Sequence, residues 1–111
     1  MPADELSVTA DGDRAVVRLR GEHESYSADH LARHLDSLLA EGLSIVVDLT
    51  ATEFVDSTVI GVLLGARRRA EGRHLPFVLV LGDRTGWPVH RLLDVTGLRS
   101  QFDIVGENAI L

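Results

Sequence analysis

Two neighbouring hydroxyl side chains, Ser57 and Thr58, stand where a strand-like pattern gives way to a helix-like one. The β-branched run at 45–47 predicts a strand, and apolar residues that recur at helical spacing from Ile60 onward predict a helix. Asp56, Ser57 and Thr58 are residue types that favour a helix N-terminus. A phosphoryl group on such a hydroxyl would lie beside free N–H groups and the positive end of the helix dipole. These residues therefore suit a phosphorylation switch, although spacing alone favours a plain helix cap.

Catalytic and metal chemistry find less support in the sequence. Asp48 and Asp56 could be a carboxylate pair for acid–base catalysis, but each is better explained as a partner for backbone N–H groups, at a strand end and a helix start. No Gly-x-Ser-x-Gly motif surrounds Ser57, so we expect no nucleophilic hydrolysis. His30 and His34 have a spacing that allows two imidazoles to share a metal, but no third ligand lies one turn further on, and an exposed helix face is the simpler interpretation. We expect no enzyme activity, no metal and no cofactor.

The composition predicts one small acidic domain. The chain has 111 residues, of which 45% are hydrophobic, and this is enough for residues 1–111 to form a single core. The absence of cysteine excludes disulfides and thiolate sites. A net charge of −6 disfavours nucleic-acid binding. No apolar run approaches the roughly 20 residues of a membrane span, and the N-terminus lacks the apolar core of a signal peptide, so we expect a cytoplasmic protein with no membrane partner.

Strands and helices are predicted to alternate along the chain. Alternating apolar residues at 6–10 and 15–19 flank Asp11-Gly12-Asp13 and predict a hairpin, which Gly21 is expected to end. The remaining elements are predicted as a helix from Ser27 to Gly42, a strand at 45–49, a helix at 57–70, a strand at 77–81, a helix from Pro88 to Gly97 and a strand near 102–105. The apolar faces of the first two helices need a common sheet to cover them. We therefore expect a mixed sheet with both helices packed on one side.

Two further features each allow two interpretations. The single tryptophan, Trp87, stands next to Pro88, and core packing at a helix start is favoured over a role as an interface anchor. A basic cluster lies at the end of the predicted second helix, at Arg67, Arg68, Arg69 and Arg73. Such a cluster is usually the exposed end of a helix, where positive charge is favourable, but it could also meet an acidic partner.

The central segment resembles the signature of STAS domains, and specifically of anti-sigma factor antagonists. That family typically reads Asp-Ser-Ser-Gly-Leu-Gly, where this chain reads Asp56-Ser57-Thr58-Val59-Ile60-Gly61. Gly21-Glu22 resembles the Gly-Glu-Leu-Asp entry to the family's first helix, and residues 89–98 resemble its last helix and Thr-Gly-Leu turn. The resemblance covers nearly the whole chain. It implies an α/β fold with a STAS-like mixed β-sheet and helices packed on one side.

The resemblance also implies a function and a surface. The chain would bind an anti-sigma factor of the Ser/Thr kinase type while unphosphorylated, and phosphorylation of Thr58, or of its neighbour Ser57, would end the interaction. The partner would supply ATP and magnesium, and a phosphatase could reverse the modification. The partner-binding residues would be Asp56, Ser57, Thr58, Val59, Glu22, His23 and Tyr26, with Val59 adding bulk where the family has glycine. A monomer or weak dimer is expected, and the alternative is a non-switched scaffold or ligand-sensing module.

Overall fold

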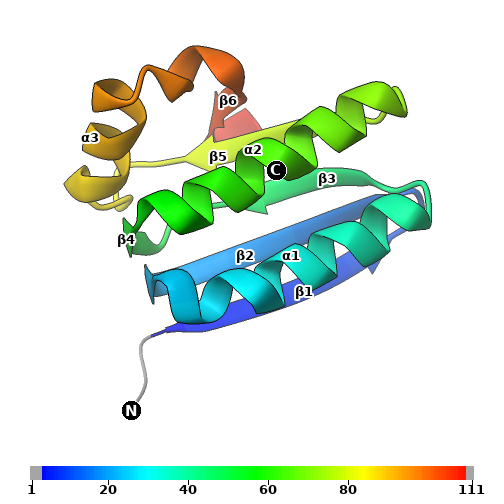
Figure 1. The fold of residues 1–111 in the computed structure, drawn as a ribbon, viewed down its shortest axis with the longest axis horizontal. Coiled ribbons are helices and arrows are strands. Elements are labelled where there is room, and N and C mark those ends of the chain that lie inside the picture. Colours follow the sequence, from blue (N-terminus) through cyan, green and yellow to red (C-terminus); the bar gives the residue numbers. More distant parts are fainter. Residues whose placement is uncertain (1–3, 110–111) are drawn as a thin grey trace.

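The computed structural model describes residues 4–109, which form a six-stranded mixed sheet and three α-helices (Figure 1). Five strands lie in the order β1-β2-β3-β5-β6, and β4 pairs with the end of β2. β1 and β2 are antiparallel, and every other pair is parallel. The strands are β1 Glu5–Asp11, β2 Arg14–His23, β3 Ser44–Asp48, β4 Thr52–Val55, β5 Phe77–Leu81 and β6 Asp103–Gly106.

The predicted hairpin is confirmed, but its second strand is longer than expected. Residues pair from Glu5↔Arg20 to Asp11↔Arg14, around a turn in which Gly12 has φ of 66°. β2 continues past Gly21 to His23, so the prediction that the strand ends at Gly21 is wrong. The reason is tertiary: the register shifts at Gly21, and the end of β2 then pairs with β4 instead of β1.

Helices α1, Ser25–Ala40, and α2, Ser57–Gly72, lie side by side on one face of the sheet, as predicted (Figure 1). Their apolar faces form the core together with the strand residues beneath them. The buried residues of the two helices are Ala28, Leu31, Leu35, Leu38, Leu39, Val59, Ile60, Leu63, Ala66 and Ala70. α1 begins two residues before Ser27, whose hydroxyl donates to the Glu24 carbonyl at 2.9 Å instead of capping the helix.

The third helix, α3 Trp87–Val95, packs against β4 near the start of α2 (Figure 1). Val89 and Leu93 are its buried residues, one helical turn apart. Gly97 adopts a positive φ of 70° after the helix, as its predicted role as the stop requires. No helix among residues 4–109 is long and apolar enough to cross a bilayer.

Candidate functional site

A single carboxylate joins the first turns of α1 and α2. Asp56 is the N-cap of α2, and its Oδ1 accepts the backbone N–H of Val59 at 3.0 Å. Its Oδ2 accepts the backbone N–H of Ser25, the first residue of α1, at 2.9 Å. Asp56 therefore satisfies one donor in each of two helix N-termini and fixes their relative position.

Asp56→Ala should lower the free energy of unfolding by about 2 kcal/mol, because two capping bonds of about 1 kcal/mol each are lost. Asp56→Asn should fall between the parent and alanine, since the amide keeps one acceptor oxygen and turns a donor toward the other N–H group. Urea denaturation of the three proteins measures this order. Equal stability of the asparagine and parent proteins would contradict the double cap.

Ser57 and Thr58 occupy the first two positions of α2, and both are exposed. Because Asp56 performs the capping, the interpretation of these hydroxyls as plain caps is wrong. Neither hydroxyl has a hydrogen-bond partner within residues 4–109. The backbone N–H groups of Ser57 and Thr58 also lie in the first turn, where a helix supplies no internal acceptor. Among the described residues, the two hydroxyls are thus free and stand beside backbone N–H groups that have no acceptor.

Val59 and His23, both expected on the partner-binding surface, are instead buried. The Val59 side chain is 0% exposed and belongs to the core, so it cannot add bulk to a docking surface. His23 is 4% exposed, and its Nε2 lies 3.1 Å from the Glu5 carbonyl and 3.0 Å from the Arg20 carbonyl. Since both partners are acceptors, Nε2 carries the hydrogen, and the ring joins β2 to β1.

Glu22 and Tyr26 remain accessible next to Asp56. The Tyr26 hydroxyl donates to Asp4 Oδ2 at 3.3 Å, and the ring is 67% exposed. Desolvation at the protein surface and the neighbouring Asp4 carboxylate raise the pKa of Tyr26 above its ordinary value, so the phenol stays a neutral donor. The exposed part of the predicted surface is therefore Glu22, Tyr26, Ser57 and Thr58, and Asp56 beside them is half-buried.

Trp87 lies at the surface and not in the core, contrary to the favoured interpretation. The residue is 71% exposed, and it borders an open groove of about 540 Å³ beside the start of α2. The helical phase explains the error: the buried face of α3 is set by Val89 and Leu93, and a residue two positions before Val89 points away from that face. That spacing was readable in the sequence.

The residues considered for acid–base catalysis and for metal binding have structural roles or lie exposed on a helix. Asp48 Oδ1 accepts the Thr50 N–H at 2.9 Å, so Asp48 binds the backbone of the following loop, as expected. Its Oδ2 lies 3.3 Å from Arg18 Nε, and Asp48 and Asp56 therefore have different partners. The rings of His30 and His34 lie edge to face with centroids 6.4 Å apart, on an exposed helix face. Within residues 4–109, no group of three or more His, Cys, Asp or Glu residues is placed to hold a metal ion.

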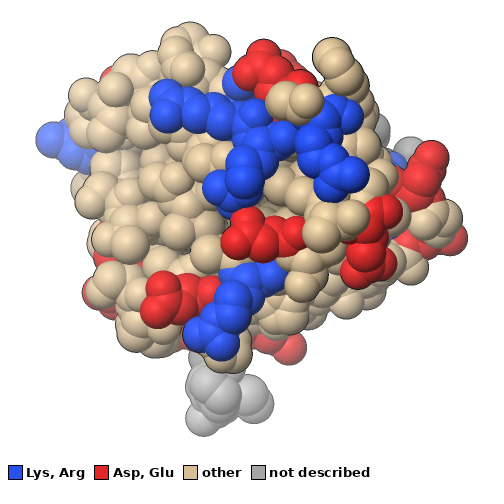
Figure 2. Space-filling model, turned by 45° about the vertical axis from the view of Figure 1, so that its right-hand side comes forward, with Lys and Arg blue, Asp and Glu red and all other residues tan. Residues whose placement is uncertain are grey.

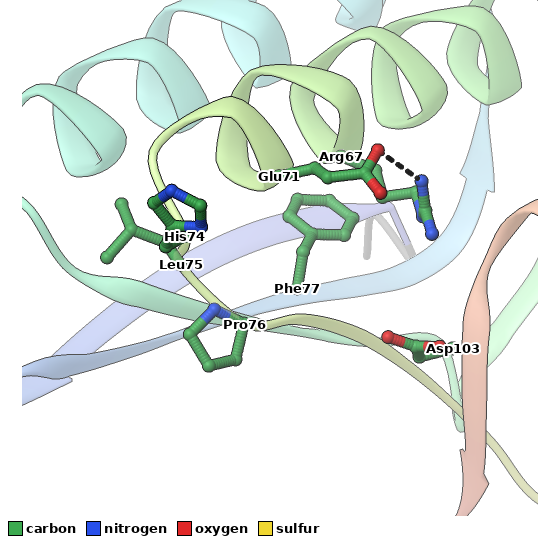
Figure 3. Close-up of a pocket in the computed structure, with 7 residues that line it drawn as sticks. All are labelled: Arg67, Glu71, His74, Leu75, Pro76, Phe77 and Asp103. Carbon is green, nitrogen blue, oxygen red and sulfur yellow. Dashed lines mark hydrogen bonds and ion pairs between the residues drawn. The ribbon is translucent and has the colours of Figure 1, made fainter.

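The arginine cluster lies at the far end of α2 from Asp56, where arginine side chains gather on the surface (Figure 2). Arg69 pairs with Asp36 of α1 at 2.6 Å, and Arg73 donates to the Leu39 carbonyl, so the cluster ties the ends of the two helices together. Next to it is a hollow of about 380 Å³, and the α2 side of the hollow carries an Arg67–Glu71 ion pair of 3.2 Å (Figure 3). This hollow is separated from Asp56 by the length of α2.

A mixed sheet with two helices packed on one face is the architecture of a STAS domain. The family model described as "Mlab, STAS domain" matches residues 6–106. The chain belongs to the STAS domain family, and its relatives include anti-sigma factor antagonists.

The similarity to those relatives extends over most of the chain. The anti-sigma-B factor antagonist of Listeria monocytogenes is 32% identical over 96 residues, which cover 85% of this chain and 81% of that protein. The anti-sigma F factor antagonist of Paenibacillus polymyxa is 32% identical over 87 residues, which cover 75% and 70%. The crystal structure of an anti-sigma factor antagonist from Mycobacterium paratuberculosis shares the fold with a TM-score of 0.77 at 24% identity, covering 90% and 83% of the two chains. The unphosphorylated form of SpoIIAA gives a TM-score of 0.71 at 18% identity, covering 91% and 87%.

Proposed function

We propose that this protein binds an anti-sigma factor of the Ser/Thr kinase type and thereby regulates transcription that depends on a sigma factor. The contact surface is the exposed start of α2, with Asp56, Ser57 and Thr58, and the adjoining residues Glu22 and Tyr26. The observation that carries this proposal is the pair of free hydroxyls beside Asp56, whose carboxylate caps two helices. The names of the relatives supply the class of partner.

Phosphorylation of Thr58, in preference to Ser57, switches the interaction off. A phosphoryl group adds nearly two negative charges at neutral pH, and the N–H groups of the first helical turn and the helix dipole stabilise such a charge in the free protein. The domain itself therefore tolerates the modification. A partner surface fitted to a neutral hydroxyl does not, because the new charge would be dehydrated next to Asp56.

The proposed switch assigns different roles to this chain and to its partners. The kinase brings ATP and magnesium, and a separate phosphatase restores the free hydroxyl. This chain contributes the acceptor hydroxyl and a fixed surface around it. Its role is that of a binding protein in the cytoplasm, whose state of modification decides whether the anti-sigma factor is occupied.

Thr58→Glu should weaken binding of the cognate anti-sigma factor by about 1 to 3 kcal/mol, because a carboxylate beside Asp56 places like charges in a dehydrated interface. Thr58→Ala should bind normally but gain no phosphate. Titration calorimetry with candidate anti-sigma factor kinases from the source organism, and phosphosite mapping by mass spectrometry after incubation with ATP, measure both effects.

Ser37→Glu is the matched control, because Ser37 is an exposed helix position near the opposite end of α1 and gains the same charge. It should bind like the parent chain. Normal binding of Thr58→Glu, together with no phosphate on either hydroxyl, would refute the switch and favour a constitutive binder or scaffold module.

A further inference from the structure

The groove beside Trp87 combines an exposed aromatic side chain with a rim of carboxylates. We call it the Trp87 groove, and it is lined by Glu22, Glu24, Glu53, Phe54, Gly86, Trp87 and Pro88. It is an open surface groove with a volume of about 540 Å³. An indole 71% exposed is unusual for a residue that contributes most when it is buried. The exposed indole therefore marks a surface that gains from being covered.

The backbone that presents Trp87 is held firmly. The Gly86 N–H donates to the Thr52 carbonyl at 2.8 Å, which fastens the start of α3 to β4. A side chain at position 86 would collide with the backbone of Glu53, so the two segments are in direct backbone contact. An aromatic residue on a fixed backbone loses little conformational entropy when a partner covers it.

The rim carries three carboxylates, on Glu22, Glu24 and Glu53, all of them exposed. Within residues 4–109, none of these three carboxylates makes an ion pair or a hydrogen bond. Three like charges around one groove repel each other, and a cation placed among them relieves that repulsion. A cation above the indole face also gains a cation–π interaction.

The groove is continuous with the surface around Thr58. β4, which contributes Glu53 and Phe54, leads directly into Asp56, and Glu22 is the cross-strand partner of Phe54. The first turns of α1, α2 and α3 lie at the same end of the molecule (Figure 1). A partner that covers Thr58 is therefore positioned to reach the Trp87 groove as well.

We propose that the Trp87 groove receives a basic segment of the anti-sigma factor, in which an arginine or lysine is flanked by apolar side chains. The cation lies over the indole and among the three carboxylates, and the apolar neighbours cover Phe54 and Pro88. This inference rests on the proposed function and extends the contact beyond the helix start to α3. The acidic rim makes nucleic acid an unfavourable occupant of the same groove.

Trp87→Ala should weaken binding of the anti-sigma factor at least about 30-fold, as is typical when a central aromatic anchor is removed from an interface. The probe is the purified kinase that binds the parent chain in the titrations above. The matched control is Val95→Ala, because Val95 is also an exposed apolar residue of α3, at 66%, but lies at the other end of the helix. It should bind like the parent, and circular dichroism should show that both variants are folded.

Charge provides a second test. The combined variant Glu22→Gln, Glu24→Gln and Glu53→Gln should bind more weakly than the parent and should lose most of the salt dependence of binding, because the carboxylates no longer attract the basic segment. The control is Glu41→Gln with Asp11→Asn and Asp103→Asn, which removes the same number of charges from exposed carboxylates outside the groove. Trp87 is the only tryptophan, so 5-fluorotryptophan labelling gives one ¹⁹F signal that should shift when the partner binds.

The outcomes separate the two proposals. Weak binding by Trp87→Ala with normal binding by Val95→Ala supports the Trp87 groove. If Trp87→Ala binds as tightly as the parent while Thr58→Glu does not, the groove proposal is overturned and the proposed function stands. If the parent chain binds none of the candidate anti-sigma factors, the proposed function fails and the groove proposal fails with it.

Discussion

Replacing Val59 with glycine should lower the free energy of unfolding by about 3 kcal/mol, of which about 2.5 comes from the lost burial of the side chain and about 0.5 from the lower helix propensity of glycine. Val59 is 0% exposed in the third position of α2, where its side chain fills the core under the capping aspartate. The loss should move the thermal midpoint down by about 12 °C in a domain of this size. Urea denaturation and a calorimetric scan measure the two quantities.

Thr58→Gly is the control for this change, because it places glycine one residue earlier in the same helical turn without removing a buried side chain. It should lower the free energy of unfolding by less than about 1 kcal/mol. Equal losses for the two variants would show that Val59 contributes through the backbone alone. Val59→Gly is thus expected to lower stability. It should not speed phosphorylation of Thr58, because the buried Val59 side chain adds no bulk to the surface that a kinase would contact.

Helical phase decides which residues near the switch are exposed, and the sequence contains that phase. Val59, Leu63, Ala66 and Ala70 recur at helical spacing, and all four are buried. The resemblance to the family's glycine directed the expectation for Val59 toward the surface, although the spacing placed it on the core stripe. Trp87 was expected in the core and is exposed, and its spacing from Val89 and Leu93 places it on the solvent-facing side of α3.

The strands that were predicted are those with a local apolar pattern. β5 has the predicted bounds, 77–81, because five consecutive apolar residues suit a buried parallel strand. β4 is absent from the predicted elements, because Thr52 and Glu53 open it with polar side chains. Thr52 is nevertheless fully buried, and its hydroxyl donates to the Leu19 carbonyl at 2.6 Å. This strand exists because β2 extends to meet it, and no local pattern carries that information.

The site was predictable in position but not in its bonding. The order Asp56-Ser57-Thr58 placed two hydroxyls at a helix start, and the structure confirms that placement. The bond from Ser25 to Asp56 joins residues 31 positions apart, and nothing local at either end predicts it. The same applies to the Trp87 groove, whose walls come from β2, β4 and the start of α3.

Gly86→Ala should also cause a large loss of stability, because Gly86 lies in the backbone contact that holds α3 against β4. Gly86 has φ of −61° and ψ of 143°, values open to any residue, so the glycine is required by space and not by conformation. An added Cβ would lie against the Glu53 carbonyl oxygen and 2.7 Å from the carbonyl carbon. Because these are backbone atoms of a paired strand, they cannot move aside without breaking the contact between α3 and β4.

Gly86→Ala should therefore lower the free energy of unfolding by about 3 kcal/mol, the upper end of the range typical of overpacking. Gly82→Ala, four residues earlier, is the control: its Cβ would meet Glu107 Oε1 at 2.5 Å, and that carboxylate is the end of a flexible side chain that can turn away. The control should lose less than about 1 kcal/mol. Urea denaturation followed by the fluorescence of Trp87 measures both, and it reports on the start of α3 directly because the chain has no other tryptophan. If Gly86→Ala proved as stable as Gly82→Ala, α3 would have room to shift away from β4. Trp87 would then not be held in a fixed position beside the start of α2, and a fixed position could not explain how it binds a partner.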